Sequence, residues 1–416
     1  MRIAIVGTGI SGLLAAHQLH GEQEITVFEA GDTVGGHTST VTVGREHGDY
    51  EVDTGFIVFN ETTYPNFVKL LRRLGVSHRP TSMNFSVRCE QTGMEYGSAS
   101  LGAVFAQRRN LLRPRFLRML REILRFNREG KRLLETGTEA PDLGSLLEAG
   151  RYSSEFVTYY IVPLGSAIWS TSPARMLEFP ANFFLRFLDN HGLLSVDDQP
   201  QWQVIEGGSR RYVEALTRPF KDRIRTRATV RSVRREEDRV LLKVDGVPEE
   251  TFDHVVLATH SDQALSMLED ATTAEQKILG AIPYQDNDVV LHTDARMLPR
   301  SRKAWSSWNY HVTSETNDRV VTTYHMNSLQ SLDAPEEFCV TLNRDEEIDA
   351  ERVLRRQVMA HPVYLPESVE AQRRHHEISG KRRTHYCGAY WANGFHEDGV
   401  NSALAACAWF GRGELT

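Results

Sequence analysis

The chain contains 416 residues, enough for two or three domains around a sizeable core, and its apolar (40%) and charged (25%) fractions are ordinary for a soluble protein. Lysine and arginine number 48 against 55 acidic residues, and the resulting net charge of −7 argues against general nucleic-acid binding. The four cysteines lie far apart and form no C-x-x-C pair, which predicts reduced thiols, an intracellular protein and no metal site.

Two features of the chain bear on its location. No apolar run approaches the roughly 18 residues of a membrane-spanning helix. The first predicted strand begins at the start of the sequence, which leaves no signal peptide. Both features predict a cytoplasmic protein.

The first predicted elements are a strand at residues 1–6, the turn G-T-G-I-S-G at 7–12 and an Ala/Leu-rich helix at 13–19. A G-x-G-x-x-G turn between a strand and a helix is the context in which this motif binds a dinucleotide. Its glycines permit the tight turn, the close approach of a pyrophosphate and the packing of the helix on the strand. The N–H groups and dipole of the helix start favour phosphate. The predicted phosphate contacts are Gly7, Gly9, Ile10, Ser11 and Gly12.

A second predicted strand, residues 25–28, ends at Glu29, which follows Gly12 by 17 residues (29 − 12). An acid at about this distance binds the ribose 2′-OH of the nucleotide. A carboxylate there would repel a 2′-phosphate, so the sequence predicts a nucleotide of the NAD or FAD kind rather than NADP.

The stretch after this strand decides between the two nucleotides. It reads E-A-x-x-x-x-G-G-H-x-x-T and resembles the flavin-containing amine oxidase superfamily, which includes monoamine oxidases, protoporphyrinogen oxidase and phytoene desaturases. The resemblance implies FAD, bound non-covalently because no cysteine matches the family's linkage motif. His37 stands where the family usually has arginine, so a phosphate-neutralising charge there becomes pH-dependent. The implied contacts in this stretch are Glu29, Ala30, Gly35, Gly36, His37 and Thr38.

The C-terminal segment resembles the last motif of the same family. A predicted strand at 384–387 leads to Gly388, and a small-residue helix follows at 400–410, with Asp398 as its expected N-cap. In the family this helix start points at the O2 and N1 edge of the flavin, where reduced flavin carries negative charge. The usual ribityl-binding acid is absent, so Glu397 or Asp398 is expected to replace it. The implied contacts are Gly388, Asp398, Gly399 and Val400.

Three further segments resemble family strands around the cofactor. Residues 52–57 resemble a strand whose glycine passes the flavin ring, residues 229–233 a strand whose backbone pairs with adenine, and residues 253–259 a strand that closes the nucleotide domain. The implied contacts are Thr54, Gly55, Phe56, Ile57, Val230, Ala258 and Thr259.

These motifs predict an α/β fold in which a Rossmann-type FAD-binding domain carries an inserted α+β substrate domain. The FAD-binding domain is expected at residues 1–80, 205–285 and 375–416, and the substrate domain at 81–204 and 286–374. Within the latter, periodicity predicts helices at about 114–134, 143–150, 153–168 and 180–191, and strands at 305–311 and 320–325.

Residues 108–132 hold ten basic residues opposed only by Glu122 and Glu129, with leucines and other apolar residues at helical spacing. A basic amphipathic helix on an acidic protein indicates a membrane surface or an anionic protein partner. The alternative is a solvated helix whose arginines pair with nearby acids. The first interpretation predicts peripheral binding to the inner face of the membrane.

The substrate is suggested by a narrower resemblance. Residues 52–67, 290–294 and 394–402 are similar to bacterial flavoproteins and to the N-terminal flavin domain of plant cyclopropane fatty acid synthases. Some of the bacterial group look like desaturases of methyl-branched and furan fatty acid biosynthesis, associated with fatty-acid methyltransferases. The resemblance implies a phospholipid acyl chain as substrate and a methyltransferase as a possible partner. An amine or polyene oxidoreductase and a non-catalytic partner of a lipid methyltransferase stay open. The stretch 284–292 holds no lysine, which weakens the amine interpretation because amine oxidases usually place one there.

Candidate bases follow from their predicted positions. His396 and Glu397 lie beside the presumed flavin edge, and Tyr310 and Tyr324 end strands of the substrate domain. Of these, His396 is the preferred candidate.

Overall fold

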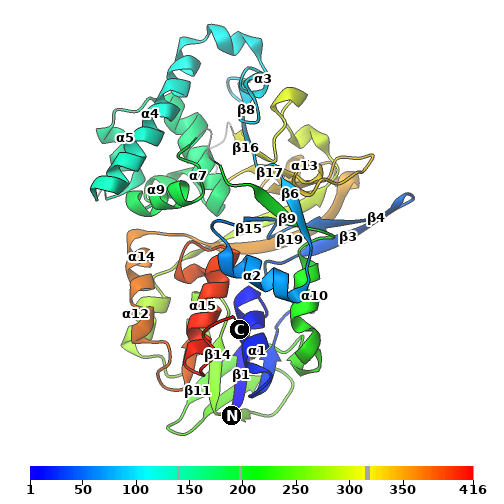
Figure 1. Ribbon diagram of the computed structural model, residues 1–416, viewed down its shortest axis with the longest axis vertical. Coiled ribbons are helices and arrows are strands. Elements are labelled where there is room, and N and C mark those ends of the chain that lie inside the picture. The colour runs from blue at the N-terminus through cyan, green and yellow to red at the C-terminus, as the bar shows by residue number, and fades with distance from the viewer. Residues whose placement is uncertain (138–140, 196–198, 314–318, 416) are drawn as a thin grey trace.

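The computed structural model describes all residues except 138–140, 196–198, 314–318 and 416. The chain forms two lobes along its long axis, and both termini lie on the lobe drawn at the bottom of Figure 1. We call this the nucleotide lobe and the other the substrate lobe. Among the described residues no helix combines the length and the hydropathy that crossing a bilayer requires.

The nucleotide lobe is built on a parallel five-stranded sheet of order β10-β2-β1-β14-β20. Its strands are β10 (Ile224–Arg225), β2 (Glu24–Phe28), β1 (Arg2–Val6), β14 (His254–Leu257) and β20 (Thr384–Tyr386). Because all five strands run the same way, their carboxyl ends meet at one edge, where open α/β sheets bind ligands.

Both faces of this sheet are covered, which its alternating side chains require. Ile3 and Ile5 pack beneath one group of helices, whereas Ala4 and Val6 face the other side. The first group is α1 (Ile10–Leu19), α2 (Pro65–Leu74), α10 (Arg210–Thr217) and α15 (His396–Ala408). The other side is covered by β11 (Val230–Arg235), β12 (Val240–Val244), β13 (Glu250–Phe252), α11 (Ser261–Met267), α12 (Thr273–Leu279) and α14 (Pro366–Arg373).

The substrate lobe contains a seven-stranded sheet of order β19-β15-β18-β17-β16-β7-β8, antiparallel except for the β16–β7 pair. Its strands are β19 (Val353–Pro362), β15 (Tyr284–His292), β18 (Cys339–Leu342), β17 (Thr322–His325), β16 (Trp308–Val312), β7 (Phe85–Cys89) and β8 (Glu95–Gly97). The helices of this lobe are α3 (Leu101–Val104), α4 (Pro114–Thr136), α5 (Leu143–Ala149), α6 (Ser154–Phe156), α7 (Val162–Trp169), α8 (Pro173–Leu177), α9 (Ala181–Asn190) and α13 (Met326–Gln330).

Two small sheets join the lobes. One is the hairpin of β3 (Thr40–Arg45) and β4 (Gly48–Asp53), and the other has the order β5 (Val58–Asn60), β9 (Trp202–Ile205), β6 (His78–Thr81). The chain therefore enters the substrate lobe after β6 and leaves it at β9, its hydrogen-bonded neighbour. Although α14 falls within the range predicted for the substrate domain, it packs against α12 of the nucleotide lobe.

Several predicted elements differ from the observed ones. The strand expected at 52–57 ends at Asp53, and the chain continues as a loop to β5. The strand expected at 305–311 begins only at Trp308. The helix expected at 153–168 contains a π-helical turn, Val157–Ile161. Pro163 explains this turn: it has no N–H to donate to Tyr159, whose carbonyl oxygen accepts from the Tyr96 hydroxyl at 2.5 Å instead.

The last helix also begins earlier than predicted. It starts at His396 instead of residue 400, and Asp398 is not its N-cap but its third residue. The Asp398 carboxylate reaches back to accept from the N–H of Phe395, the actual N-cap, at 3.0 Å. This capping geometry extends the helix by one turn.

Candidate active site

A cavity of about 710 Å³ opens at the carboxyl edge of the parallel sheet and continues into the substrate lobe. Its nucleotide end is lined by the ends of β1, β2 and β14 and by the start of α1. Its far end reaches α7, β16 and β17. A single cavity thus joins the nucleotide motifs to the substrate lobe.

The glycine turn leaves room for a diphosphate. Gly7 has φ +102°, and a Cβ on Gly12 would collide with the Gly7 carbonyl oxygen, so both positions require glycine. A Cβ on Gly9 would meet no atom within 4 Å, since it would point into the cavity. Gly36 crosses this turn so closely that its Cβ would lie 3.0 Å from the Gly9 Cα. The backbone therefore forms the cradle that a dinucleotide phosphate needs.

Glu29 lies at the end of β2 with its carboxylate held in place. One oxygen accepts from the Thr8 N–H at 3.2 Å and from the Thr8 hydroxyl, and the other accepts from the Gly31 N–H at 2.8 Å. The side chain lines the cavity, as a ribose-binding acid must.

Sixteen of the predicted cofactor contacts line the cavity and six lie behind it. The lining residues are Gly7, Gly9, Ile10, Ser11, Glu29, Ala30, Gly35, Gly36, His37, Gly55, Phe56, Ile57, Val230, Ala258, Thr259 and Gly388. The residues behind the lining are Gly12, Thr38, Thr54, Asp398, Gly399 and Val400. Gly399 is an example of a residue behind the lining. A Cβ at this position would lie 2.6 Å from the Ile10 side chain, so the glycine allows α15 to pack on α1.

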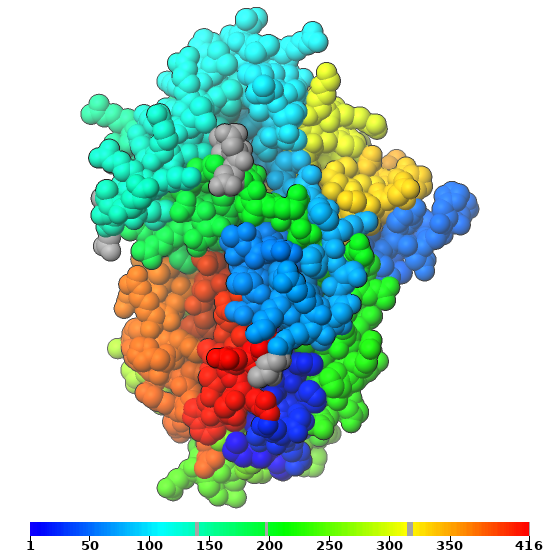
Figure 2. All heavy atoms as spheres, viewed as in Figure 1, coloured from blue at the N-terminus to red at the C-terminus, as the bar shows by residue number. Residues whose placement is uncertain are grey.

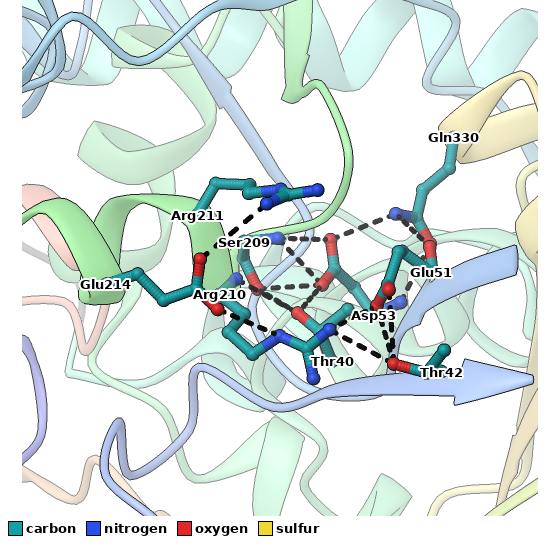
Figure 3. A network of polar contacts seen from close by, with 9 residues as sticks. All are labelled: Thr40, Thr42, Glu51, Asp53, Ser209, Arg210, Arg211, Glu214 and Gln330. Carbon is teal, nitrogen blue, oxygen red and sulfur yellow. Dashed lines mark hydrogen bonds and ion pairs between the residues drawn. The ribbon is translucent and has the colours of Figure 1, made fainter. Parts of the chain in front are cut away.

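The loop that carries Gly55 and Phe56 is anchored by the buried carboxylate of Asp53. Ser209 donates to it through its N–H (2.9 Å) and its hydroxyl (2.8 Å), and Thr40 donates at 2.6 Å. Gln330 donates at 3.1 Å from the other side, as Figure 3 shows. This network ties β3, the start of α10 and α13 to the end of β4, where the loop begins.

His396 is placed in the cavity wall at the start of α15. Its ring stacks on Phe56 with centroids 3.4 Å apart, and its Nε2 lies 2.9 Å from the Tyr212 hydroxyl and 3.1 Å from the Thr38 hydroxyl. Burial lowers the pKa of His396 well below its ordinary value, so the ring is neutral. These contacts support a role in positioning Phe56; a role as base stays a prediction.

The two acids beside His396 face away from the cavity. Glu397 accepts from the N–H groups of Asn66 (3.1 Å) and Phe67 (2.8 Å) at the start of α2. Asp398 accepts from the N–H groups of Asn393 and Phe395, and burial raises its pKa to about 6. Neither carboxylate lines the cavity, so neither position supports the expected ribityl contact.

The two tyrosine candidates differ in position. Tyr324 lines the far end of the cavity beside Ser170, and burial raises its pKa to about 12. Tyr310 is buried next to Ser166 and lies outside the lining, and burial raises its pKa as well. Only Tyr324 can therefore meet a molecule in the cavity.

Sequence reasoning missed most of the far wall. It is formed by residues of α7 and the following turn, with two aromatic residues from β16 and β17. The residues are Ala167, Ile168, Trp169, Ser170, Trp308 and Tyr324. Trp169 also donates from its indole to the Asn393 carbonyl oxygen at 3.1 Å, which fixes this wall to the segment before α15.

A cluster of three histidines borders the nucleotide end of the cavity. The rings of His260 and His361 lie 5.7 and 5.2 Å from that of His37, whose Nε2–H donates to the Ala360 carbonyl oxygen. His361 accepts from the Asn287 amide at 3.0 Å. Burial lowers the pKa of all three, to about 3 for His260 and His361. The cluster supplies neutral N–H groups instead of a fixed positive charge. Only His37 belongs to a sequence motif; nothing in the sequence marks the other two.

The acidic, basic and sulfur-containing residues limit what the cavity can hold. Among the lining residues that the structure describes, Glu29 is the only acidic one and Arg231 the only basic one, histidines aside, and none is a lysine. None of the four buried cysteines lines it, which favours non-covalent binding of the cofactor. The described residues contain no cluster of three or more possible metal ligands.

Comparisons with known proteins agree with this geometry. The family model described as flavin containing amine oxidoreductase matches residues 10–408, and the chain therefore belongs to this family. Cyclohexylamine oxidase from Brevibacterium oxydans has a TM-score of 0.72 at 16% identity, with 98% of each chain covered. The CLA-producing fatty acid isomerase from P. acnes has a TM-score of 0.70 at 17% identity, also with 98% of each chain covered. A putative protoporphyrinogen oxidase from Exiguobacterium sp. has a TM-score of 0.67 at 19% identity, covering 99% of this chain and 98% of that one.

The family confirms the predicted fold and cofactor. The protein is an FAD-dependent oxidoreductase with the amine oxidase-like fold. The narrower subgroup of fatty acid enzymes and the identity of the substrate stay predictions, because similarity at this level of identity establishes the fold alone.

Proposed function

We propose that this enzyme oxidises a methyl-branched or unsaturated fatty acyl chain of a phospholipid and leaves a new carbon–carbon double bond. One observation carries the proposal: the far end of the cavity is walled by Ile168, Trp169, Trp308 and Tyr324, with no carboxylate among its described lining residues. An ammonium group would lose its hydration there with only aromatic rings, and no carboxylate, to compensate, whereas an acyl chain would gain apolar burial.

The chemistry explains why the acyl chain must be modified. A flavin bound in this cavity would supply the hydride acceptor; a base would take the proton from the neighbouring carbon, and dioxygen would serve as the final oxidant. An unactivated CH₂ is a poor hydride donor. A position next to a double bond or a branch is a better one, because it delocalises or stabilises the developing positive charge.

The chain itself contributes orientation and exclusion of water. Trp169 holds the far wall against the segment that leads to α15 through its bond to the Asn393 carbonyl oxygen. Phe56 is held flat by the buried ring of His396. The polar groups of this wall include the hydroxyls of Tyr324 and Ser170.

Anaerobic reduction of the bound flavin tests the proposal. The holoenzyme is mixed without oxygen with vesicles of methyl-branched phospholipid, and loss of the yellow flavin absorbance is followed. We expect bleaching with the branched lipid, none with its straight-chain saturated counterpart, and a new double bond in the recovered lipid by mass spectrometry. Bleaching by amines alone would contradict the proposal and favour an amine oxidase. No bleaching by lipid or amine, together with co-purification of a methyltransferase, would favour a non-catalytic partner.

A charge in the far wall provides a second test. Replacing Ile168 with aspartate places a carboxylate where we expect the acyl chain, and we expect the rate of bleaching by branched lipid to fall at least about tenfold. FAD affinity should change little, because Ile168 lies on α7 at the far end of the cavity, away from the glycine turn and Glu29 at its nucleotide end. Ile168→Val, which preserves an apolar wall, should retain the rate of the unmodified enzyme. An Ile168→Asp enzyme that binds FAD and bleaches normally would exclude an acyl chain at this wall.

A further inference from the structure

Exposed apolar side chains gather at one end of the molecule. Eight large apolar residues are exposed in the described part of the chain, and four of them belong to residues 101–124. Leu101 is 79% exposed, Leu112 is 86% exposed, and Leu111 and Leu124 are about half exposed. Leu101 begins α3, and Leu111 and Leu112 end the 3₁₀ helix η1 (Arg108–Leu112), just before α4. We call these three leucines the leucine tip; they lie on the segment that forms the cyan top of the molecule in Figure 2.

Arginines surround this tip without acidic residues between them. Residues 101–121 contain six arginines and no aspartate or glutamate. Arg108 and Arg109 precede the two leucines of η1, and Arg113 follows them. The rest of the protein is acidic, with a net charge of −7 overall, so the positive charge is concentrated at one end.

The acidic residues near this charge, which are the predicted Glu122 and Glu129 and also Glu155, are buried or already bonded. Glu122 is buried and accepts from the Ser153 N–H at 3.2 Å and from its hydroxyl. Glu129 accepts from the Tyr152 hydroxyl at 2.5 Å and lies 3.7 Å from Arg125. Glu155 pairs with Arg118 (2.6 Å) and Arg115 (3.5 Å).

Seven basic residues of this region have no acidic partner within ion-pair distance in the described part of the chain; Arg109 and Arg113 bond only to neutral oxygens, and the other five have no acidic partner either. These five are Arg108, Arg121, Arg128, Lys131 and Arg132, and all five are exposed. Along α4, Leu124 lies between Arg121 and Arg128 at helical spacing, so leucine and unpaired arginine share one outer face. The alternative of a solvated helix whose arginines all pair with nearby acids therefore does not describe this face of α4.

We propose that the leucine tip and the outer face of α4 dock this protein on an anionic lipid surface. Apolar side chains flanked by unpaired arginines match the boundary of such a bilayer, where leucines enter the acyl region and arginines remain with the phosphates. Each basic residue near the surface of an anionic membrane strengthens binding about fivefold. A nucleic acid would use the arginines but leave the leucines in water. The concentrated charge also orients the acidic remainder of the molecule away from the membrane.

The docking surface belongs to the lobe that carries the far wall of the cavity. Both α4 and α7 lie in the substrate lobe, at the top of Figure 1. Docking by this end would therefore leave the nucleotide lobe in solvent. The proposal concerns binding to a surface and does not rest on which substrate the cavity takes.

Sedimentation with vesicles tests the surface directly, without turnover. The FAD-loaded protein is mixed with vesicles of phosphatidylcholine alone or with about one third phosphatidylglycerol. We expect binding to the anionic vesicles only, and weakening when NaCl is raised from about 0.05 M to about 0.5 M. The double variant Leu111→Ser, Leu112→Ser should bind at least about tenfold more weakly. The triple variant Arg108→Gln, Arg121→Gln, Arg128→Gln should lose about 100-fold at low salt.

Matched controls separate this surface from general effects. Val247→Ser with Val358→Ser removes two exposed apolar side chains elsewhere, and Arg218→Gln with Lys221→Gln and Lys277→Gln removes the same charge from the nucleotide lobe. Both controls should bind vesicles as the unmodified protein does, and all variants should retain their FAD, which reports folding. Failure of the unmodified protein to bind anionic vesicles would overturn the proposal. Equal losses in the control variants, or unchanged binding in the tip variants, would do the same.

Discussion

Replacing Gly9 with glutamate is expected to abolish FAD binding while the apoprotein stays folded. The backbone of Gly9 is at φ −66°, which any residue adopts, and its Cβ would meet no protein atom within 4 Å. The new side chain would instead fill the space above the start of α1 and place a negative charge where the diphosphate must bind. We expect the dissociation constant for FAD to rise at least about 100-fold, or about 2.7 kcal/mol. Titration of apoprotein with FAD, followed by flavin fluorescence, measures it.

Gly21 provides the matched control for this substitution. It lies in the turn after α1, and its Cβ would also meet no atom within 4 Å, but it does not line the cavity. Gly21→Glu should leave FAD affinity and the melting temperature of the apoprotein close to those of the unmodified protein. If Gly9→Glu bound FAD with unchanged affinity, the glycine turn would not hold the diphosphate, and the assignment of the nucleotide end of the cavity would be wrong.

The nucleotide end was predictable because its constraints are local in sequence. A continuously apolar strand, a turn that needs glycine at Gly7 and Gly12, and an acid after the second strand specify the same geometry in any chain that folds this way. The predicted strands at 1–6, 25–28 and 384–387 all belong to the observed parallel sheet.

The sequence indicates Tyr324 as a candidate site residue, but most of the far wall could not be predicted, because its residues meet only through tertiary packing. Trp169 ends a helix, Trp308 and Tyr324 lie on neighbouring strands, and no spacing in the sequence links the helix to these strands. The same holds for His361, which lies 5.2 Å from His37 although 324 positions (361 − 37) separate them. The orientations of Glu122 and Glu397 were also hidden, since a carboxylate that caps a backbone N–H looks in sequence like an exposed one.

The network around Asp53 was likewise invisible in the sequence, and its removal should weaken both the fold and the cofactor site. Asp53→Ala would leave the hydroxyl of Thr40, the N–H and hydroxyl of Ser209 and the amide of Gln330 without their shared acceptor (Figure 3). Buried donors without an acceptor cost about 1–3 kcal/mol each before the structure relaxes, so we expect a loss of about 3 kcal/mol or more. Because Thr54, Gly55 and Phe56 follow directly, FAD affinity should fall as well. Urea unfolding and FAD titration measure the two effects.

The pH dependence of unfolding separates the effect of the Asp53 charge on stability from the effect of its hydrogen bonds and packing. Burial raises the pKa of Asp53 from 3.8 to about 6, which means that the fold favours the protonated carboxyl group. The stability gained from this preference is fully present below about pH 4 and is lost as the pH rises through about 6. Asp53→Asn does not ionise at this position. The unmodified protein should therefore lose roughly 3 kcal/mol of unfolding free energy between pH 4 and pH 7.5, relative to the Asp53→Asn variant.

Thr42 is the control within the same network. It is exposed at the rim, where it bonds to Glu51 and Arg210, and Thr42→Ala should change stability by no more than about 0.5 kcal/mol at either pH. A pH-independent difference between Asp53→Asn and the unmodified protein would mean that Asp53 ionises in the fold as it does in water. The hydrogen bonds from its donors would then compensate fully for the burial of the negative charge. The ionised carboxylate, and not the protonated carboxyl group, would anchor the loop at Gly55.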